Sequence, residues 1–198
     1  MAATLQREAV QLGTAPKPAL LEFVPGATGL VVLAPRLRLL RIGRHRQRVL
    51  GALHERRLAT LDLDAPAQLE PALRWSAQQP ELGSLPLGLW LDRDAAPMAL
   101  ELAAKEPARV RALVLVNPQW QAAAALAQVA AATLLMQLGG RPSQLAAQHR
   151  ALAQLRCNKR LEQVPLPASD AAGAGAVEAV AQIASAWMAT HLSDRRML

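Results

Sequence analysis

Aromatic side chains are scarce in this sequence. Its 198 residues include no tyrosine and a single phenylalanine, and four tryptophans are spread along the chain at positions 75, 90, 120 and 187. Proteins that bind single-stranded nucleic acid use clustered aromatic rings on which the bases stack. We therefore interpret the tryptophans as packing residues and do not expect specific nucleic-acid binding.

Cysteines and long apolar runs are also missing. Cys157 is the single cysteine, which excludes an internal disulfide bond and a cysteine-based metal site and fits a reducing compartment. No apolar run reaches the roughly 18 residues of a membrane span, and residues 1–10 lack the features of a signal peptide. We expect a cytoplasmic protein that does not contact a membrane.

The sequence contains no motif of a cofactor enzyme. It has no phosphate-binding Walker pattern, no glycine-rich dinucleotide fingerprint and no metal-ligand spacing of histidines and carboxylates. We expect neither a cofactor nor a metal ion.

Positive charge is abundant and unevenly placed. The formal net charge is +7, and eight arginines and two histidines fall in one short stretch whose only acid is Glu55. Such a cluster favours an anionic partner, but it is equally typical of a solvated helix face in an arginine-rich protein. Both interpretations stay open. The cluster consists of Arg36, Arg38, Arg41, Arg44, Arg46, Arg48, Arg56, Arg57, His45 and His54.

Apolar runs alternate with helical patterns along the chain, which indicates an α/β fold. We predict a doubly wound, mostly parallel sheet of about six to eight strands between two helix layers, in one domain over residues 1–198. Besides a short edge strand at 20–24, the expected core strands are 30–34, 58–63, 85–91, 110–116, 132–138 and 157–165. The expected helices are 44–57, 68–79, 95–106, 118–129, 143–155 and 176–191, before a frayed tail at 193–198.

The segment from Leu85 to Leu100, LPLGLWLDRDAAPMAL, reads as a buried strand that turns sharply at Asp92-Arg93-Asp94 into a helix. In a parallel sheet, such a turn presents its residue at the carboxyl edge, where ligands bind. With the following run PARVRALVL at 107–115, this segment resembles the nucleophile elbow of the α/β-hydrolases, particularly their dienelactone-hydrolase-like branch. The resemblance covers about residues 28–192 and implies that residues 1–28 form abbreviated opening strands.

The resemblance implies a serine or cysteine at the elbow, an acid after the 132–138 strand and a histidine near the end of the chain. The corresponding positions hold Arg93, Pro142 and Ser169 instead. Both elbow glycines are replaced, by Leu91 and Ala95, which we expect to weaken the tight turn. Pro35 stands in the oxyanion loop and has no N–H to donate.

Because nucleophile, acid and base are replaced together, we interpret the chain as a pseudoenzyme that serves as a binding or protein-interaction module. The alternative is a residual or atypical esterase that uses Asp92 or Asp94 at the elbow. That hydrolase would need a base from His45, His54, His149 or His191, all of which fall in expected helices.

Arginines replace the catalytic groups, and we expect four of them at the carboxyl edge of the sheet: Arg36, Arg38, Arg93 and Arg141. They would suit a small anionic ligand, because guanidinium groups pair bidentately with carboxylate or phosphate. Alternatively, Arg93 and Arg141 pair internally with Asp62, Asp64, Asp92, Asp94 or Asp170 and plug the former site. An unknown protein partner or a second copy of the chain is the remaining expectation.

Overall fold

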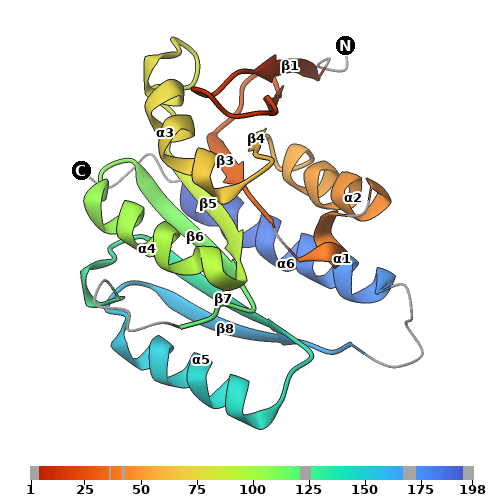
Figure 1. Ribbon diagram of the computed structural model, residues 1–198, viewed down its shortest axis with the longest axis vertical. Helices are drawn as coiled ribbons and strands as arrows, with labels where there is room; N and C mark the ends of the chain where they lie inside the picture. Colours follow the sequence, from red (N-terminus) through yellow and green to blue (C-terminus); the bar gives the residue numbers. More distant parts are fainter. Residues whose placement is uncertain (1–4, 36, 42, 121–125, 167–172, 194–198) are drawn as a thin grey trace.

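The computed structural model describes residues 5–35, 37–41, 43–120, 126–166 and 173–193. One sheet of eight strands runs through the molecule in the order β1-β2-β4-β3-β5-β6-β7-β8 (Figure 1). The strands are β1 Gln6–Val10, β2 Ala19–Phe23, β3 Gly29–Leu33, β4 Leu58–Asp62, β5 Leu87–Asp92, β6 Val110–Val116, β7 Ala132–Leu138 and β8 Lys159–Val164.

Six of these strands, β3 to β8, are parallel, as the apolar runs predict. β1 and β2 are antiparallel to their neighbours. The expected strand at 20–24 is therefore present, but it is not at the edge, because β1 lies outside it. β1 has no apolar pattern that would predict a strand, since only Val10 of its five residues is buried.

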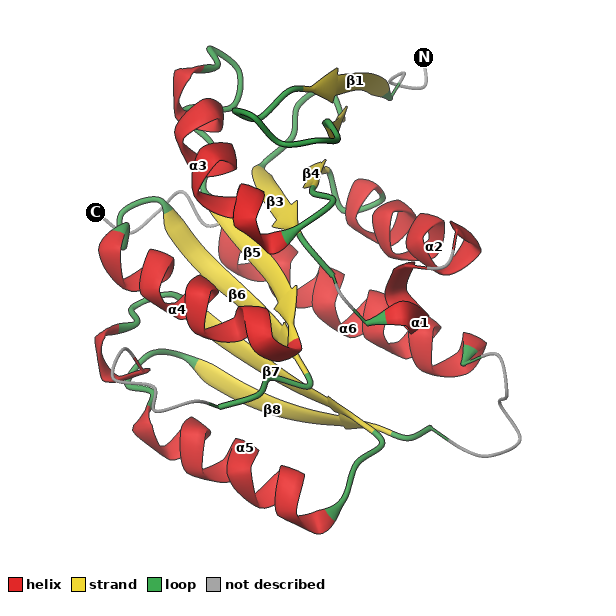
Figure 2. Cartoon of the chain, viewed as in Figure 1, coloured by secondary structure: helices red, strands yellow, loops and turns green. Residues whose placement is uncertain are grey.

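Helices cover both faces of the sheet and make a three-layer sandwich (Figure 2). One face packs against α3 Leu69–Gln78, α4 Ala96–Lys105 and α5 Pro142–Gln154. The other face packs against α1 Arg38–Arg41, α2 Gly43–His54 and α6 Ala174–Leu192. This confirms the predicted doubly wound α/β architecture.

The central strands are buried along their whole length because helices lie on both of their faces. All six residues of β5 and all seven of β7 are buried. Gly88 of β5 lies under α6, where an added Cβ would sit 2.5 Å from the sulfur of Met188. The elbow strand is thus fixed by close contact with a helix on one side.

The predicted helix at 118–129 is wrong for the described part of that segment. Pro118, Gln119 and Trp120 are not helical, and only a single 3₁₀ turn, η3 Leu126–Gln128, follows. Tertiary hydrogen bonds hold this stretch open: the Gln119 N–H donates to the Arg93 carbonyl at 3.0 Å. The Pro118 carbonyl accepts from the Gln148 side chain of α5 at 3.1 Å.

Candidate functional site at the β5–α4 turn

The turn from β5 into α4 has the shape of a nucleophile elbow. Asp92 is still extended, with φ −140° and ψ 163°, and Arg93 then adopts a left-handed backbone with φ 52°. A 3₁₀ turn, η2 Arg93–Ala95, leads directly into α4. The backbone adopts the tight turn although Leu91 and Ala95 replace the expected glycines, and the expectation that their loss weakens it stays a prediction.

The Arg93 conformation is costly. A left-handed backbone in a residue other than glycine costs about 1–3 kcal/mol and persists only where the surrounding structure imposes it. The buried neighbours Leu91 and Ala95 supply that constraint, because each is at most 4% exposed. Arg93 itself is exposed. The fold therefore holds one arginine in the position from which hydrolases present a nucleophile.

A pocket of about 270 Å³ lies beside this turn. Its walls come from the β5–α4 turn, the loop after β6, strand β7 and the first turns of α5. It is lined by Arg93, Asn117, Pro118, Gln119, Trp120, Gln137, Ser143, Gln144, Ala147 and Gln148. Arg93 is the only charged residue of this set, and none of the ten is an acid.

Side-chain amides form a hydrogen-bond network along the wall of the pocket. Gln148 donates to Gln137 Oε1 at 3.2 Å and accepts from the Trp120 indole N–H at 2.8 Å. Asn117, which also has a left-handed φ of 47°, accepts from the Leu138 N–H at 2.6 Å. Buried polar networks of this kind are stable when their members are satisfied. They hold the β6 loop, β7 and α5 in a fixed arrangement around the pocket.

The sequence reasoning missed this amide network. Gln137 is the feature of the sequence that points to the network, because it is a polar residue in the mostly apolar β7 and is only 3% exposed. Its partners come from an irregular loop and from a distant helix. Their approach depends on tertiary structure and not on a local pattern.

Arg93 makes no ion pair with any of the described residues. Within the described residues, its guanidinium has neither a carboxylate partner nor a side-chain hydrogen bond. Two helix N-termini adjoin the pocket: α4 begins just after the turn, and Ser143 and Gln144 lie in the first turn of α5. Helix N-termini favour negative charge. The electrostatic character of the pocket is therefore positive.

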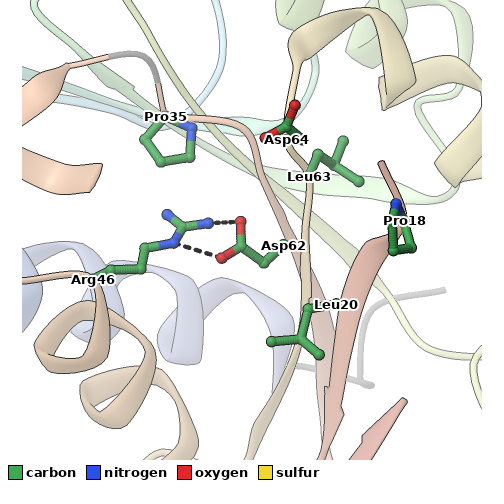
Figure 3. A pocket seen from close by; sticks show the side chains of 7 residues that line it. All are labelled: Pro18, Leu20, Pro35, Arg46, Asp62, Leu63 and Asp64. Atoms are coloured by element: carbon green, nitrogen blue, oxygen red, sulfur yellow. Dashed lines mark hydrogen bonds and ion pairs between the residues drawn. The ribbon is translucent and has the colours of Figure 1, made fainter. Parts of the chain in front are cut away.

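Asp62, one of the acids proposed to plug the site, is paired with a different arginine. Arg46 of α2 donates from Nε to Asp62 Oδ2 at 2.6 Å and from Nη2 to Oδ1 (Figure 3). This pair lines a separate pocket of about 250 Å³ with Pro35 and Asp64. Lys17 lies 3.4 Å from Asp64 Oδ1. The predicted plug is thus not formed with Asp62, and Asp170 lies outside the described residues.

The two candidate nucleophiles differ in their surroundings. Asp92 is fully buried, and its Oδ2 accepts the Leu37 N–H at 2.8 Å. This hydrogen bond connects the loop after β3 to the end of β5, so Asp92 has a structural role. Asp94 is exposed in the first turn after the elbow. Arg93, and neither aspartate, has the left-handed conformation of the elbow residue.

The other predicted site residues are dispersed. Arg141 is exposed just before α5 and does not line the Arg93 pocket, and Pro142 is the first residue of that helix. Arg38 belongs to α1, but the placement of its side chain is not described. Arg36 and Ser169 lie outside the described residues, as does the predicted frayed tail from residue 194 onward.

None of the four histidines lines the Arg93 pocket. His45 is buried in α2, where Nδ1 lies 3.0 Å from the Leu39 carbonyl. His54 lies 3.0 Å from Thr60 Oγ1 and 3.7 Å from the buried Glu22 carboxylate. His149 is exposed on α5, and His191 stacks against Trp187 with ring centroids 4.3 Å apart.

His54 is expected to make the protein less stable in mild acid. Burial lowers the pKa of His54 below its ordinary value, although the Glu22 carboxylate opposes that shift. Below about pH 6.5 the unfolded state then binds a proton that the folded state refuses, so stability falls as pH decreases. Urea denaturation at pH 7.5 and 5.5 should show a larger loss for the native protein than for His54→Gln. Equal losses would contradict this assignment.

The arginine-rich stretch is largely bonded internally. In addition to the Arg46 pair, Arg48 pairs with Glu178 of α6. Arg56 donates to Ser185 Oγ at 2.9 Å. Arg57 is exposed beyond α2 and donates to the Gly26 carbonyl at 3.1 Å. These contacts join α2 to β4 and α6, which favours the structural interpretation of the cluster.

The described residues contain neither a membrane-spanning helix nor a cluster of metal-binding side chains. No helix there has the length and apolar content that crossing a membrane requires. No group of three or more histidine, cysteine or acidic side chains lies together in a way that would hold a metal ion.

Known structures of similar fold are numerous. A dienelactone hydrolase from Anabaena variabilis has a TM-score of 0.81 and 28% sequence identity, over 97% of this chain and 100% of that one. Est1E from Butyrivibrio proteoclasticus has a TM-score of 0.72 and 13% identity, over 95% and 99%. The esterase domain of a Rhodothermus marinus protein has a TM-score of 0.71 and 15% identity, over 96% and 100%.

Comparisons of the sequence itself are less informative. No protein-family model matches the chain, and no curated protein matches it. The sheet order, the left-handed residue between β5 and α4 and the structural similarity agree with one another. The chain therefore has the fold of the α/β-hydrolases and resembles their dienelactone-hydrolase-like branch.

Proposed function

We propose that this chain is a non-catalytic α/β-hydrolase-like protein that binds a small anionic ligand in the pocket beside Arg93. The observation that carries the proposal is the exposed Arg93 guanidinium, held at the elbow without an internal ion pair among the described residues. The neighbours of hydrolase fold support the fold, and the residues at the elbow support binding in place of catalysis.

The absence of suitable groups at the elbow supports the non-catalytic part of the proposal. Serine-type hydrolysis needs a nucleophile and a base within hydrogen-bond reach of each other. Among the described residues that line the pocket, Ser143 has the only hydroxyl group, and none is a histidine, a cysteine or an acid. An arginine at the elbow cannot attack a carbonyl carbon, because it stays protonated at physiological pH.

The anionic ligand is supported by the charge balance of the pocket. Arg93 supplies the only formal charge of the lining, and the starts of α4 and α5 add partial positive charge. A ligand that pairs with Arg93 gains a charge-assisted hydrogen bond without breaking an ion pair first. A positive pocket that lacks acids is suited to retain an anion, which in a hydrolase would be an intermediate or product.

Purified protein is expected to hydrolyse p-nitrophenyl acetate no faster than a matched control, because no base lines the elbow pocket. The control is the same concentration of protein kept unfolded by urea during the assay, and each rate is corrected for hydrolysis in the matching buffer without protein. Release of p-nitrophenolate at 405 nm gives the rate. Turnover above the control that Asp92→Asn or Asp94→Asn abolishes would contradict the proposal and support the hydrolase alternative.

A further inference from the structure

We infer that the ligand of the Arg93 pocket is a small hydroxylated carboxylate, a compound that joins one carboxylate to several hydroxyl groups. This inference rests on the proposed anion site and adds the chemical class of its ligand. Three features of the pocket support it: the number of cations, the supply of unused amide groups and the size.

The described lining offers one cationic side chain to a negatively charged ligand. Arg93 is the only cationic side chain among the ten lining residues. A guanidinium matches the planar shape of a carboxylate, because two parallel N–H groups meet two oxygens. Phosphate esters carry close to two negative charges at neutral pH and are usually met by more than one cation. A carboxylate therefore fits the lining better.

The remaining polar groups match hydroxyl groups. Gln148 and Asn117 are used within the protein, since both ends of each amide are hydrogen-bonded. Gln119 has no side-chain partner among the described residues, and neither do Gln137 Nε2 and Gln144 Nε2. An amide offers both donors and an acceptor, and a hydroxyl group needs both.

The volume and the walls of the pocket limit the size of the ligand. The volume of about 270 Å³ is slightly below the range of roughly 300–1,000 Å³ that is usual for drug-sized ligands. Trp120 is half-buried, and its indole N–H is fixed by Gln148, so its ring forms a rigid part of the wall. Aromatic walls beside amides accommodate the C–H faces and hydroxyl edges of a polyol chain.

Isothermal titration with matched compounds tests this inference. D-Gluconate has a carboxylate and hydroxyl groups, hexanoate has only the carboxylate, and D-glucose has only hydroxyl groups. We expect gluconate to bind at least about tenfold more tightly than hexanoate or glucose, because hydrogen bonds add to the charged contact. Inorganic phosphate is titrated in parallel and is expected to bind more weakly than gluconate.

A variant isolates the contribution of the hydroxyl groups. Gln119→Met keeps the side-chain length but removes the amide, so it should weaken gluconate binding about threefold to tenfold and leave hexanoate binding unchanged. Gln78→Met is the matched control, because Gln78 is exposed at the end of α3 and does not line the pocket. It should change neither affinity.

The possible failures are distinguishable. Equal binding of gluconate and hexanoate, both lost in Arg93→Ala, would overturn the hydroxylated class and leave the anion site intact. Tighter binding of phosphate than of gluconate, again dependent on Arg93, would also overturn the class alone. The absence of binding by gluconate, hexanoate and phosphate would overturn the inference and count against the anion site proposed above.

Discussion

Arg93→Ala is expected to weaken anion binding about tenfold to a hundredfold while leaving the melting temperature of the free protein nearly unchanged. A hydrogen bond to a charged group contributes about 1.5–3 kcal/mol, and 1.4 kcal/mol corresponds to a factor of ten. The free protein loses little, because no internal partner of Arg93 is present among the described residues. Thermal shift with increasing gluconate, at two salt concentrations, measures both quantities.

Two further variants make this result interpretable. Arg150→Ala removes an exposed arginine from α5, outside the set that lines the pocket, and should leave anion binding unchanged. Arg93→Gly should weaken binding as much as Arg93→Ala does and raise the free energy of unfolding by up to about 1 kcal/mol, because glycine adopts a left-handed backbone without strain. A clear loss of stability in Arg93→Ala would instead mean that the guanidinium holds the fold together.

Trp90→Ala is expected to lower the free energy of unfolding by about 3–5 kcal/mol, which is typical for truncation of a buried large aromatic residue. Trp90 is 1% exposed in β5 and belongs to the core on the α2 and α6 side of the sheet. Trp90 lies three residues before Arg93, and its backbone carbonyl accepts a hydrogen bond from the Ala34 N–H at 3.1 Å. Urea denaturation followed by circular dichroism measures the loss.

Trp75→Ala is the matched comparison, because Trp75 is only half-buried on α3. The free energy of unfolding should fall clearly less in Trp75→Ala than in Trp90→Ala, since less apolar area of Trp75 leaves water on folding. Equal losses of unfolding free energy in the two variants would contradict the position of β5 as a buried central strand.

The fold could be predicted from the sequence wherever burial left a continuous apolar run. The ends of β6 and β7 agree with the predicted strands, because both strands lie between two helix layers. β1 has four exposed residues out of five and pairs only with β2, so it left no pattern to find. The composition of 118–129 favours a helix, but the Gln119 N–H donates to the Arg93 carbonyl and the Pro118 carbonyl accepts from the Gln148 side chain, so 118–120 is not helical.

The site could be predicted only in part. The position of Arg93 followed from a strand that bends into a helix, a local feature that the sequence displays. The amides around it come from β7, α5 and the loop after β6, and only tertiary structure brings them together. The arginine-rich stretch suggested an anion surface, yet Arg46 and Arg48 pair with acids of β4 and α6.

The most direct test of the anion pocket is a crystal structure of the protein grown or soaked with D-gluconate at neutral pH. We predict electron density in the pocket with a carboxylate about 2.7–3.0 Å from the Arg93 guanidinium nitrogens, and hydroxyl groups hydrogen-bonded to Gln119, Gln137 or Gln144. Density for gluconate on the arginines of α2, with the pocket beside Arg93 filled only by solvent, would contradict it.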